Sequence, residues 1–322
     1  MLHLGRIYPL SPLYSSDIHH IAPQKVLLLN MKVYKFGGTS VGSPERMKEV
    51  SRLITEDGEP KVVVLSAMSG TTNSLVEIAD YLRKGNPEGA SNMVNRLHNL
   101  YKQHLPLLYS KEETTTKVRE RLDDIFLQLH EFRTREFSEA DEKAILAQGE
   151  IMSTNMVTEY LKECGVKAIL LPALDYMRLD VNGEPDLPYI RERLAYLLDK
   201  NPNYDIYITQ GFICRNADGQ IDNLQRGGSD YTASLIGAAI RANEIQIWTD
   251  IDGMHNNDPR FVEGTTPVRQ LNFEEAAELA YFGAKILHPT CVQPARYAGV
   301  PVRLKNTMDP QAPGTLINNE CE

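Results

Sequence analysis

The stretch Lys32-Val-Tyr-Lys-Phe-Gly-Gly-Thr-Ser-Val-Gly-Ser-Pro-Glu45 gives the clearest local indication of the fold. Residues 32–36 have the pattern of a short strand, which Gly37-Gly38 ends. Ser43-Pro44-Glu45 then supplies an N-cap, a proline at the first helical position and an acid in the first turn. We therefore predict a strand, a glycine-rich turn and a helix that continues to about residue 55.

The same order of strand and helix recurs along the chain. Residues 61–66 form a continuous apolar run, which is typical of a strand buried on both faces of a parallel sheet. Asn216-Ala-Asp-Gly219 predicts the turn of a hairpin. Further strands are predicted at residues 167–171, 205–210, 244–249, 302–305 and 315–317. Helices are predicted from about residue 73, across 88–164 with breaks near Pro106 and Phe137, and at 189–198, 229–242, 272–282 and 289–298. The alternation predicts an α/β sandwich with a largely parallel sheet.

Composition excludes several classes of protein. Across 322 residues, 34 Lys and Arg stand against 43 Asp and Glu, a net charge of −9. An overall attraction to nucleic acid or an acidic membrane is therefore not expected, and any anionic ligand needs a local cluster of positive groups. The four cysteines form no CxxC pair, which indicates free thiols in a reducing cytoplasm. No apolar run approaches the roughly 20 residues of a membrane helix. Residues 1–30 are expected to be a disordered extension.

The first glycine-rich junction has the features of an anion site. In Lys35-Phe-Gly-Gly-Thr-Ser40 the glycines let backbone N–H groups approach a ligand, and the next helix adds the positive end of its dipole. Lys35 supplies a mobile positive charge. A plain tight turn with a surface lysine explains this motif equally well when it is taken alone. It is not a P-loop, because Ser43 stands where the lysine should be, and it is not a GxGxxG fingerprint.

Two more junctions carry polar side chains. Arg226-Gly-Gly-Ser-Asp230 combines a guanidinium, two glycines and a carboxylate at a helix start, and an anionic ligand explains the arginine better than turn chemistry does. Asp230 alone would serve as a helix cap. Hydroxyl residues at 66–72 follow the strand at 61–66, at the usual ligand edge of a parallel sheet, and capping the next helix is the alternative. Two further segments, at residues 248–260 and 283–289, place charged side chains after a strand and between two helices.

Together these segments resemble the aspartate kinases of the amino acid kinase superfamily. KFGGTSV, VLSA…GTTN, GE at Gly149-Glu150, RGGSDYTA, WTD.DG…DPR and GAK.LHP occur in the family's order over about residues 31–318. The resemblance implies a three-layer α/β/α sandwich with a mainly parallel central sheet and two lobes. It implies an amino-acid-substrate lobe at 31–215, a nucleotide-binding lobe at 216–318 and a tail at 319–322.

The implied reaction is ATP-dependent phosphorylation of the side-chain carboxylate of L-aspartate, with ATP and Mg²⁺ as cofactors. This is the first step towards lysine, threonine, methionine and isoleucine, in the cytoplasm. The resemblance implies catalytic roles for Lys35, Asp230 and Lys285, and substrate-binding roles for Ser66, Thr72, Glu150 and Arg226. It implies that ATP is bound by Lys35, Gly37, Gly38, Ser40, Thr249, Asp250, Arg260 and Lys285, while the metal ligands stay unassigned.

The chain departs from the family pattern in three places. His255 stands where a tyrosine is common, and Gln225 replaces a glycine before the arginine. The small regulatory ACT domains that usually follow are not expected within this chain, so the feedback effector is left open, as is a homodimer. These departures keep two alternatives: a catalytically silent homologue that binds nucleotide or amino acid, and a related kinase with another substrate.

Overall fold

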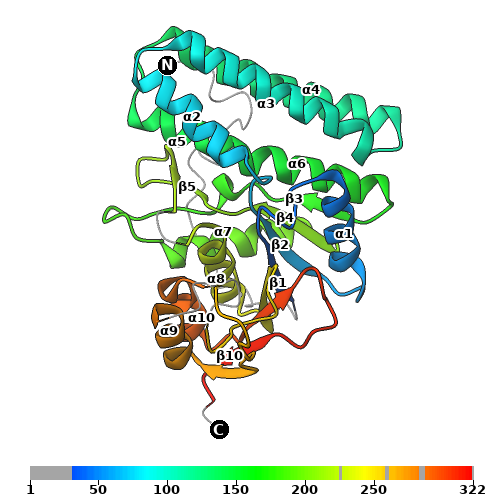
Figure 1. Cartoon of the computed structure of the whole chain (residues 1–322), viewed down its shortest axis with the longest axis vertical. Coiled ribbons are helices and arrows are strands. Elements are labelled where there is room, and N and C mark those ends of the chain that lie inside the picture. Colours follow the sequence, from blue (N-terminus) through cyan, green and yellow to red (C-terminus); the bar gives the residue numbers. More distant parts are fainter. Residues whose placement is uncertain (1–30, 225–226, 258–260, 283–286, 321–322) are drawn as a thin grey trace.

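An eight-stranded sheet runs through the middle of the molecule (Figure 1). The computed structural model describes residues 31–224, 227–257, 261–282 and 287–320. The sheet has the order β3-β4-β2-β1-β7-β9-β10-β8, and every neighbouring pair of strands is parallel except β9 and β10. Its strands are β1 (Lys32–Phe36), β2 (Lys61–Leu65), β3 (Ala168–Leu170), β4 (Ile206–Gln210), β7 (Glu244–Thr249), β8 (Gln270–Asn272), β9 (Val302–Asn306) and β10 (Thr315–Asn318).

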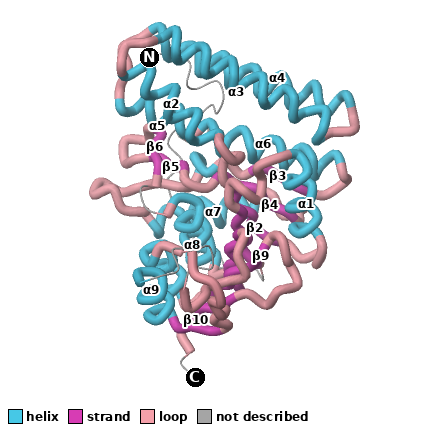
Figure 2. Tube along the Cα trace, in the orientation of Figure 1, coloured by secondary structure: helices cyan, strands magenta, loops and turns pink. Residues whose placement is uncertain are grey.

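Helices cover both faces of this sheet, and Figure 2 shows them outside the strands. In Figure 1, α7 and α8 lie on one side of the sheet and α1 lies on the other. Helix α6 packs on β2, β3 and β4, and the antiparallel pair α3 and α4 lies beyond it. The helices are α1 (Pro44–Thr55), α2 (Thr71–Arg83), α3 (Pro87–Leu108), α4 (Glu112–Glu131), α5 (Glu139–Leu146), α6 (Gln148–Glu163), α7 (Leu187–Lys200), α8 (Gly228–Ile240), α9 (Phe273–Phe282) and α10 (Gln293–Ala298).

The central position of β1 decides where a ligand can bind. Strand β1 pairs in parallel with β2 and with β7, so Phe36 lies beside Leu65 and beside Trp248. The carboxyl ends of the three strands therefore meet at one edge, where the turns that follow them come together. In open parallel sheets this edge is the usual place for a ligand.

The predicted fold class is confirmed, while several element boundaries differ. The predicted helix over 289–298 is wrong as a single helix: Pro289–Val292 is a 3₁₀ turn, and α10 starts afresh with Pro294 in its first turn, where a missing N–H costs no helical bond. The predicted break near Pro106 is confirmed: Pro106 lies in the last turn of α3, which ends at Leu108, and α4 begins at Glu112. The short strand β8 was not predicted, since three residues carry too little periodicity to be recognised.

The predicted hairpin is confirmed: β5 (Ile213–Arg215) and β6 (Ile221–Asn223) pair antiparallel as a separate two-stranded sheet. The predicted boundary between the lobes falls in its turn, while the main sheet continues through both predicted lobes. The division into lobes stays a prediction. Cys164, Cys214 and Cys291 are free thiols. Among the residues that the structure covers, no helix is both long and apolar enough to cross a membrane.

Candidate active site

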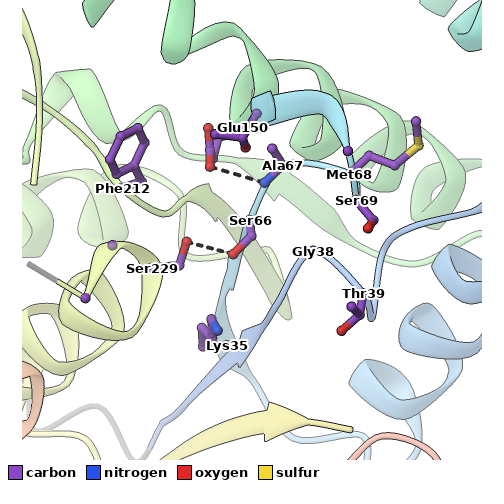
Figure 3. Close-up of a pocket in the computed structure, with 14 residues that line it drawn as sticks. Lys35, Gly38, Thr39, Ser66, Ala67, Met68, Ser69, Glu150, Phe212 and Ser229 are labelled. Atoms are coloured by element: carbon purple, nitrogen blue, oxygen red, sulfur yellow. Dashed lines mark hydrogen bonds between the residues drawn. The ribbon is translucent and has the colours of Figure 1, made fainter. Parts of the chain in front are cut away.

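A pocket of about 490 Å³ opens at the carboxyl edge of the sheet (Figure 3). It lies where the turns after β1 and β2 meet the first turns of α6 and α8. Segments that are far apart in the sequence therefore share its wall. The lining residues are Lys35, Gly38, Thr39, Ser66, Ala67, Met68, Ser69, Gly70, Thr72, Glu150, Phe212, Gly227, Gly228 and Ser229.

Among the described residues that line the pocket, Lys35 on β1 carries the positive charge. Its Nζ lies 2.7 Å from Oδ1 of Asp230, in the first turn of α8. The two side chains are 12% and 17% exposed, so water screens the pair only partly. The carboxylate holds the ammonium at the pocket wall and narrows the directions in which it can point.

The glycine pair after β1 lets two backbone segments come close. A β-carbon on Gly38 would lie 2.9 Å from the carbonyl oxygen of Ala67, which is closer than side chains approach in proteins. Ser40 closes the turn by donating its N–H to the carbonyl of Gly37 at 3.0 Å. The Ser40 side chain is buried, and no described residue hydrogen-bonds its hydroxyl. Gly37 and Ser40 lie in the predicted turn but do not line the pocket.

Glu150 is a buried carboxyl group with one oxygen in use. It stands in the first turn of α6, is 5% exposed, and accepts a hydrogen bond at 3.2 Å from the N–H of Ala67 through Oε1 (Figure 3). Within the described parts of the chain Oε2 has no hydrogen-bond partner. Burial raises the pKa of Glu150 to about 8, against the smaller lowering effect of the Ala67 N–H. A cationic group brought to Oε2 would restore the charged form.

Ser66 and Ser229 join the two halves of the pocket. The Ser66 hydroxyl donates to the Ser229 hydroxyl at 2.8 Å, across 163 positions of sequence. This contact requires β4 to end close to α8: a β-carbon on Gly211 would lie 2.1 Å from Oγ of Ser229. The next residue, Phe212, adopts a φ of 70°, an unusual value for a residue other than glycine, and its N–H donates to Oγ1 of Thr232. Its ring borders the pocket (Figure 3).

The structure brings only part of the predicted site together. Lys35, Gly38, Ser66, Thr72 and Glu150 line the pocket, and Asp230 contacts Lys35. The other predicted residues that the structure covers do not line it: these are Gly37 and Ser40 in the turn after β1, Thr249, the last residue of β7, whose hydroxyl pairs with Ile251, and the exposed Asp250. The predicted Arg226, Arg260 and Lys285 lie outside the described residues.

Sequence reasoning missed Ser229 and Phe212 as pocket residues. Ser229 was visible only as a helix start inside the glycine-rich segment. Phe212 follows a strand and a glycine, which marks a turn but gives no direction to the ring. The departure at His255 lies away from the pocket lining, where its Nδ1 shares a hydrogen bond of 3.1 Å with the hydroxyl of Thr265. Gln225 falls outside the described residues.

Comparison with known proteins places the chain in a family. A sequence profile of the amino acid kinase family matches residues 30–306. The chain belongs to the amino acid kinase family. It is 36% identical over 293 residues to the lysine-sensitive aspartokinase 3 of Escherichia coli, and 38% identical over 301 residues to the chloroplastic aspartokinase 1 of Arabidopsis thaliana. These alignments cover 90% and 88% of the chain but 64% and 51% of the relatives, so the chain spans about half to two thirds of their length.

A solved structure of this family has the same architecture. The crystal structure of E. coli aspartokinase III in complex with aspartate and ADP superposes with a TM-score of 0.82 at 35% identity. It matches 91% of this chain and 65% of that protein. The predicted mainly parallel sandwich is therefore the amino acid kinase fold.

Proposed function

We propose that the chain is an aspartate kinase, which transfers the γ-phosphoryl group of ATP to the β-carboxylate of L-aspartate and releases ADP and 4-phospho-L-aspartate. One observation carries the proposal: the pocket holds a paired lysine and an unpaired carboxylate oxygen, in a chain similar to an aspartokinase solved with aspartate and ADP. The product would enter the synthesis of lysine, threonine, methionine and isoleucine, and the predicted location is the cytoplasm. The Arabidopsis relative is a chloroplastic aspartokinase.

The chemistry asks for positive charge and orientation rather than for a base. The attacking carboxylate has a pKa of about 4 and is already ionised at neutral pH. Its attack on the γ-phosphorus forms one P–O bond and breaks the bond to the β-phosphate oxygen of ATP. Lys35 would offset the negative charge on the transferring group, and Asp230 would keep its ammonium in place.

Recognition of aspartate would use both charged groups on its α-carbon, the α-ammonium and the α-carboxylate. Oε2 of Glu150 would accept a hydrogen bond from the α-ammonium group. The ammonium group would also supply the positive charge that the buried carboxylate needs as a partner. Arg226, outside the described residues, would bind the α-carboxylate. Ser66 and Thr72 line the pocket and would position the β-carboxylate. This arrangement favours a free α-amino acid over an acylated one.

The nucleotide would be bound by the turn after β1 and by residues at and after the end of β7. We assign this role to Gly37, Gly38, Ser40, Thr249 and Asp250, and to Arg260 and Lys285 outside the described residues. In the described ranges no three His, Cys, Asp or Glu side chains gather as a metal cage. Mg²⁺ in phosphoryl-transfer sites takes one or two carboxylates besides phosphates and water, so Asp230 beside the pocket fits it. When bound, Mg²⁺ would neutralise phosphate charge.

A hydroxamate assay tests the proposal. Incubation with ATP, Mg²⁺, aspartate and hydroxylamine should give aspartyl hydroxamate, because hydroxylamine traps the acyl phosphate. Lys35→Met is the control, since it keeps the length of the side chain and removes its charge. Wild-type protein that makes no more hydroxamate than Lys35→Met would reject the proposal. Preference for glutamate over aspartate in a substrate panel would reject the substrate.

A further inference from the structure

Helix α6 approaches the loop after β2 more closely than an ordinary helix could. A β-carbon on Gly149 would lie 2.7 Å from the β-carbon of Ala67 and 3.3 Å from the side chain of Leu75. Glycine in a helix lowers stability by about 1 kcal/mol relative to alanine. Its presence at position 149 therefore indicates that the close contact between α6 and Ala67 requires a residue without a β-carbon. The close approach brings the first turn of α6 against one particular peptide unit, the one that joins Ser66 to Ala67.

Two side chains of α6 hold both ends of that peptide unit. Its N–H, from Ala67, donates to Oε1 of Glu150 at 3.2 Å. Its carbonyl, from Ser66, accepts from Oγ of Ser153 at 2.8 Å. The two residues are three positions apart and therefore lie on the same face of the helix. Ser153 is fully buried, so water does not compete for its hydroxyl.

The other polar groups of Ser66 are also bound. Its N–H donates to the carbonyl of Phe36 at 3.1 Å, which continues the pairing of β2 with β1. Its hydroxyl donates to Ser229 on α8. With the N–H and the carbonyl both held, the peptide planes on either side of Ser66 cannot rotate freely. The direction of the Ser66 hydroxyl at the pocket wall is thereby set from α6.

We propose that Ser153 is a positioning residue for the acceptor substrate, acting through the Ser66–Ala67 peptide unit that it holds together with Glu150. The proposal rests on the proposed aspartate kinase activity. Ser153 does not line the pocket and touches no reacting group. Glu150 accordingly has two separate tasks: Oε1 holds the loop, and Oε2 is left for the substrate.

The test is Ser153→Ala, with Thr158→Val as the matched control. Thr158 is another buried hydroxyl of α6, which donates to the carbonyl of Thr154 at 2.7 Å and lies away from the pocket lining. We expect Ser153→Ala to lower kcat/KM for aspartate about tenfold or more, mainly through kcat, because the nucleophile is misaligned. KM for ATP should change less than about twofold. Ser153→Cys, which keeps the volume and a weak donor, should recover part of the loss.

Amide hydrogen exchange gives a readout that does not depend on catalysis. Exchange in residues 66–72 should become faster in Ser153→Ala and stay at the wild-type rate in Thr158→Val. If the wild type makes no hydroxamate while exchange changes in this way, the kinase function fails and the clamp on the peptide stands. If the wild type is active and Ser153→Ala matches Thr158→Val in both kcat/KM and exchange, the positioning role is overturned. If Ser153→Ala does not fold, Ser153→Cys is judged by the same two measurements.

Discussion

Glu150 shows at the scale of one residue how burial prepares a binding group. Its carboxyl group is 5% exposed and has one oxygen that no described residue satisfies. Because burial raises the pKa to about 8, the free protein holds this group mostly protonated at pH 7. Binding of an ammonium group then requires loss of that proton, so affinity for an amino acid is linked to pH.

This linkage predicts how KM for aspartate changes with pH. Below pH 8, each step up in pH deprotonates more of Glu150 and favours a bound ammonium, so KM for aspartate should fall from pH 6 to pH 8. Glu150→Gln should raise KM and make it nearly independent of pH in this range, because the amide cannot ionise. Initial rates over a pH series at saturating ATP measure both. A Glu150→Gln profile parallel to the wild type would assign the pH dependence to another group.

The same residue also affects the stability of the fold, which should decrease as pH rises. Its pKa is raised in the folded state, so the protonated form stabilises the fold fully below the unfolded value of about 4.5. This stabilisation is lost as pH rises through about 8. Urea unfolding at pH 6 and pH 8 should therefore show a smaller loss of stability with pH in Glu150→Gln than in the wild type. Equal slopes in the two proteins would contradict the raised pKa.

At the scale of elements, the pocket depends on helix starts that lie against loops. Helix α3 packs on both α1 and α2, the helices that follow the two junctions of the N-terminal half. From α3, the Tyr101 hydroxyl lies 2.9 Å from Oγ1 of Thr71, the first residue of α2, and both side chains are buried. Helix α3, which carries no pocket residue, thus holds the start of α2, which supplies Thr72.

Tyr101→Phe should lower the free energy of unfolding by about 1–2 kcal/mol, because it leaves the buried Thr71 hydroxyl without its partner. Tyr109→Phe is the matched control: Tyr109 is also buried, and its hydroxyl donates to the carbonyl of Met156 at 2.8 Å, away from the pocket. Both variants should lose similar stability in urea titrations. Only Tyr101→Phe should raise KM for aspartate. A rise of equal size in the control would show a general effect of destabilisation.

Gly149→Ala should destabilise the protein, although alanine has a higher helix propensity than glycine. In an exposed helix this change stabilises by about 1 kcal/mol, but here the new β-carbon meets Ala67 and must push α6 away from the loop. We expect lower stability and lower kcat/KM for aspartate. The double variant Gly149→Ala with Ala67→Gly removes one of the two clashing carbons and should recover part of both. Absence of recovery would place the strain elsewhere.

At the scale of the whole molecule, a buried charged pair that stabilises the fold lies at the opposite end of the sheet from the pocket. The pocket lies at the carboxyl ends of β1 and β2, whereas a buried lysine, Lys61, lies at the amino end of β2. Its ammonium donates to the carbonyl of Ile54 at 2.8 Å and pairs with Asp57. Burial would raise the pKa of Asp57, but its hydrogen bond from Lys61 and the charge of Lys32 lower it below its usual range.

Asp57→Asn should therefore destabilise without changing catalysis. It removes the charge that compensates buried Lys61, and we expect a loss of about 1–3 kcal/mol in urea unfolding. KM for aspartate and kcat should stay at wild-type values, because the whole length of β2 separates this group from the pocket. The stability advantage of the wild type should shrink as pH falls below about 4, because Asp57 is protonated there in the unfolded chain and only at lower pH in the folded protein. A change in KM would contradict this separation.

Local sequence determined the alternation of strands and helices and the glycine-rich turns after them. Ser43 caps α1 and Pro44 begins it, as the residues predicted, because caps and turns depend only on near neighbours in the chain. The sequence predicted that the turns containing Gly38 and Ala67 lie at the same edge of the sheet, but it did not predict that they touch. For the same reason Lys35, Ser66 and Glu150 were recognised as polar groups at element ends, without their distances.

Tertiary structure alone decided which of these groups meet. The Ser66–Ser229 and Glu150–Ala67 contacts join residues 163 and 83 positions apart, and no pattern within a short segment encodes such distances. They follow from the order of strands in the sheet and from how closely α6 and α8 pack upon it. The sequence by itself therefore determined a family, a fold class and a set of polar turns. Packing determined that Lys35 faces Asp230, that Ser153 holds the loop, and that one oxygen of Glu150 is left for a ligand.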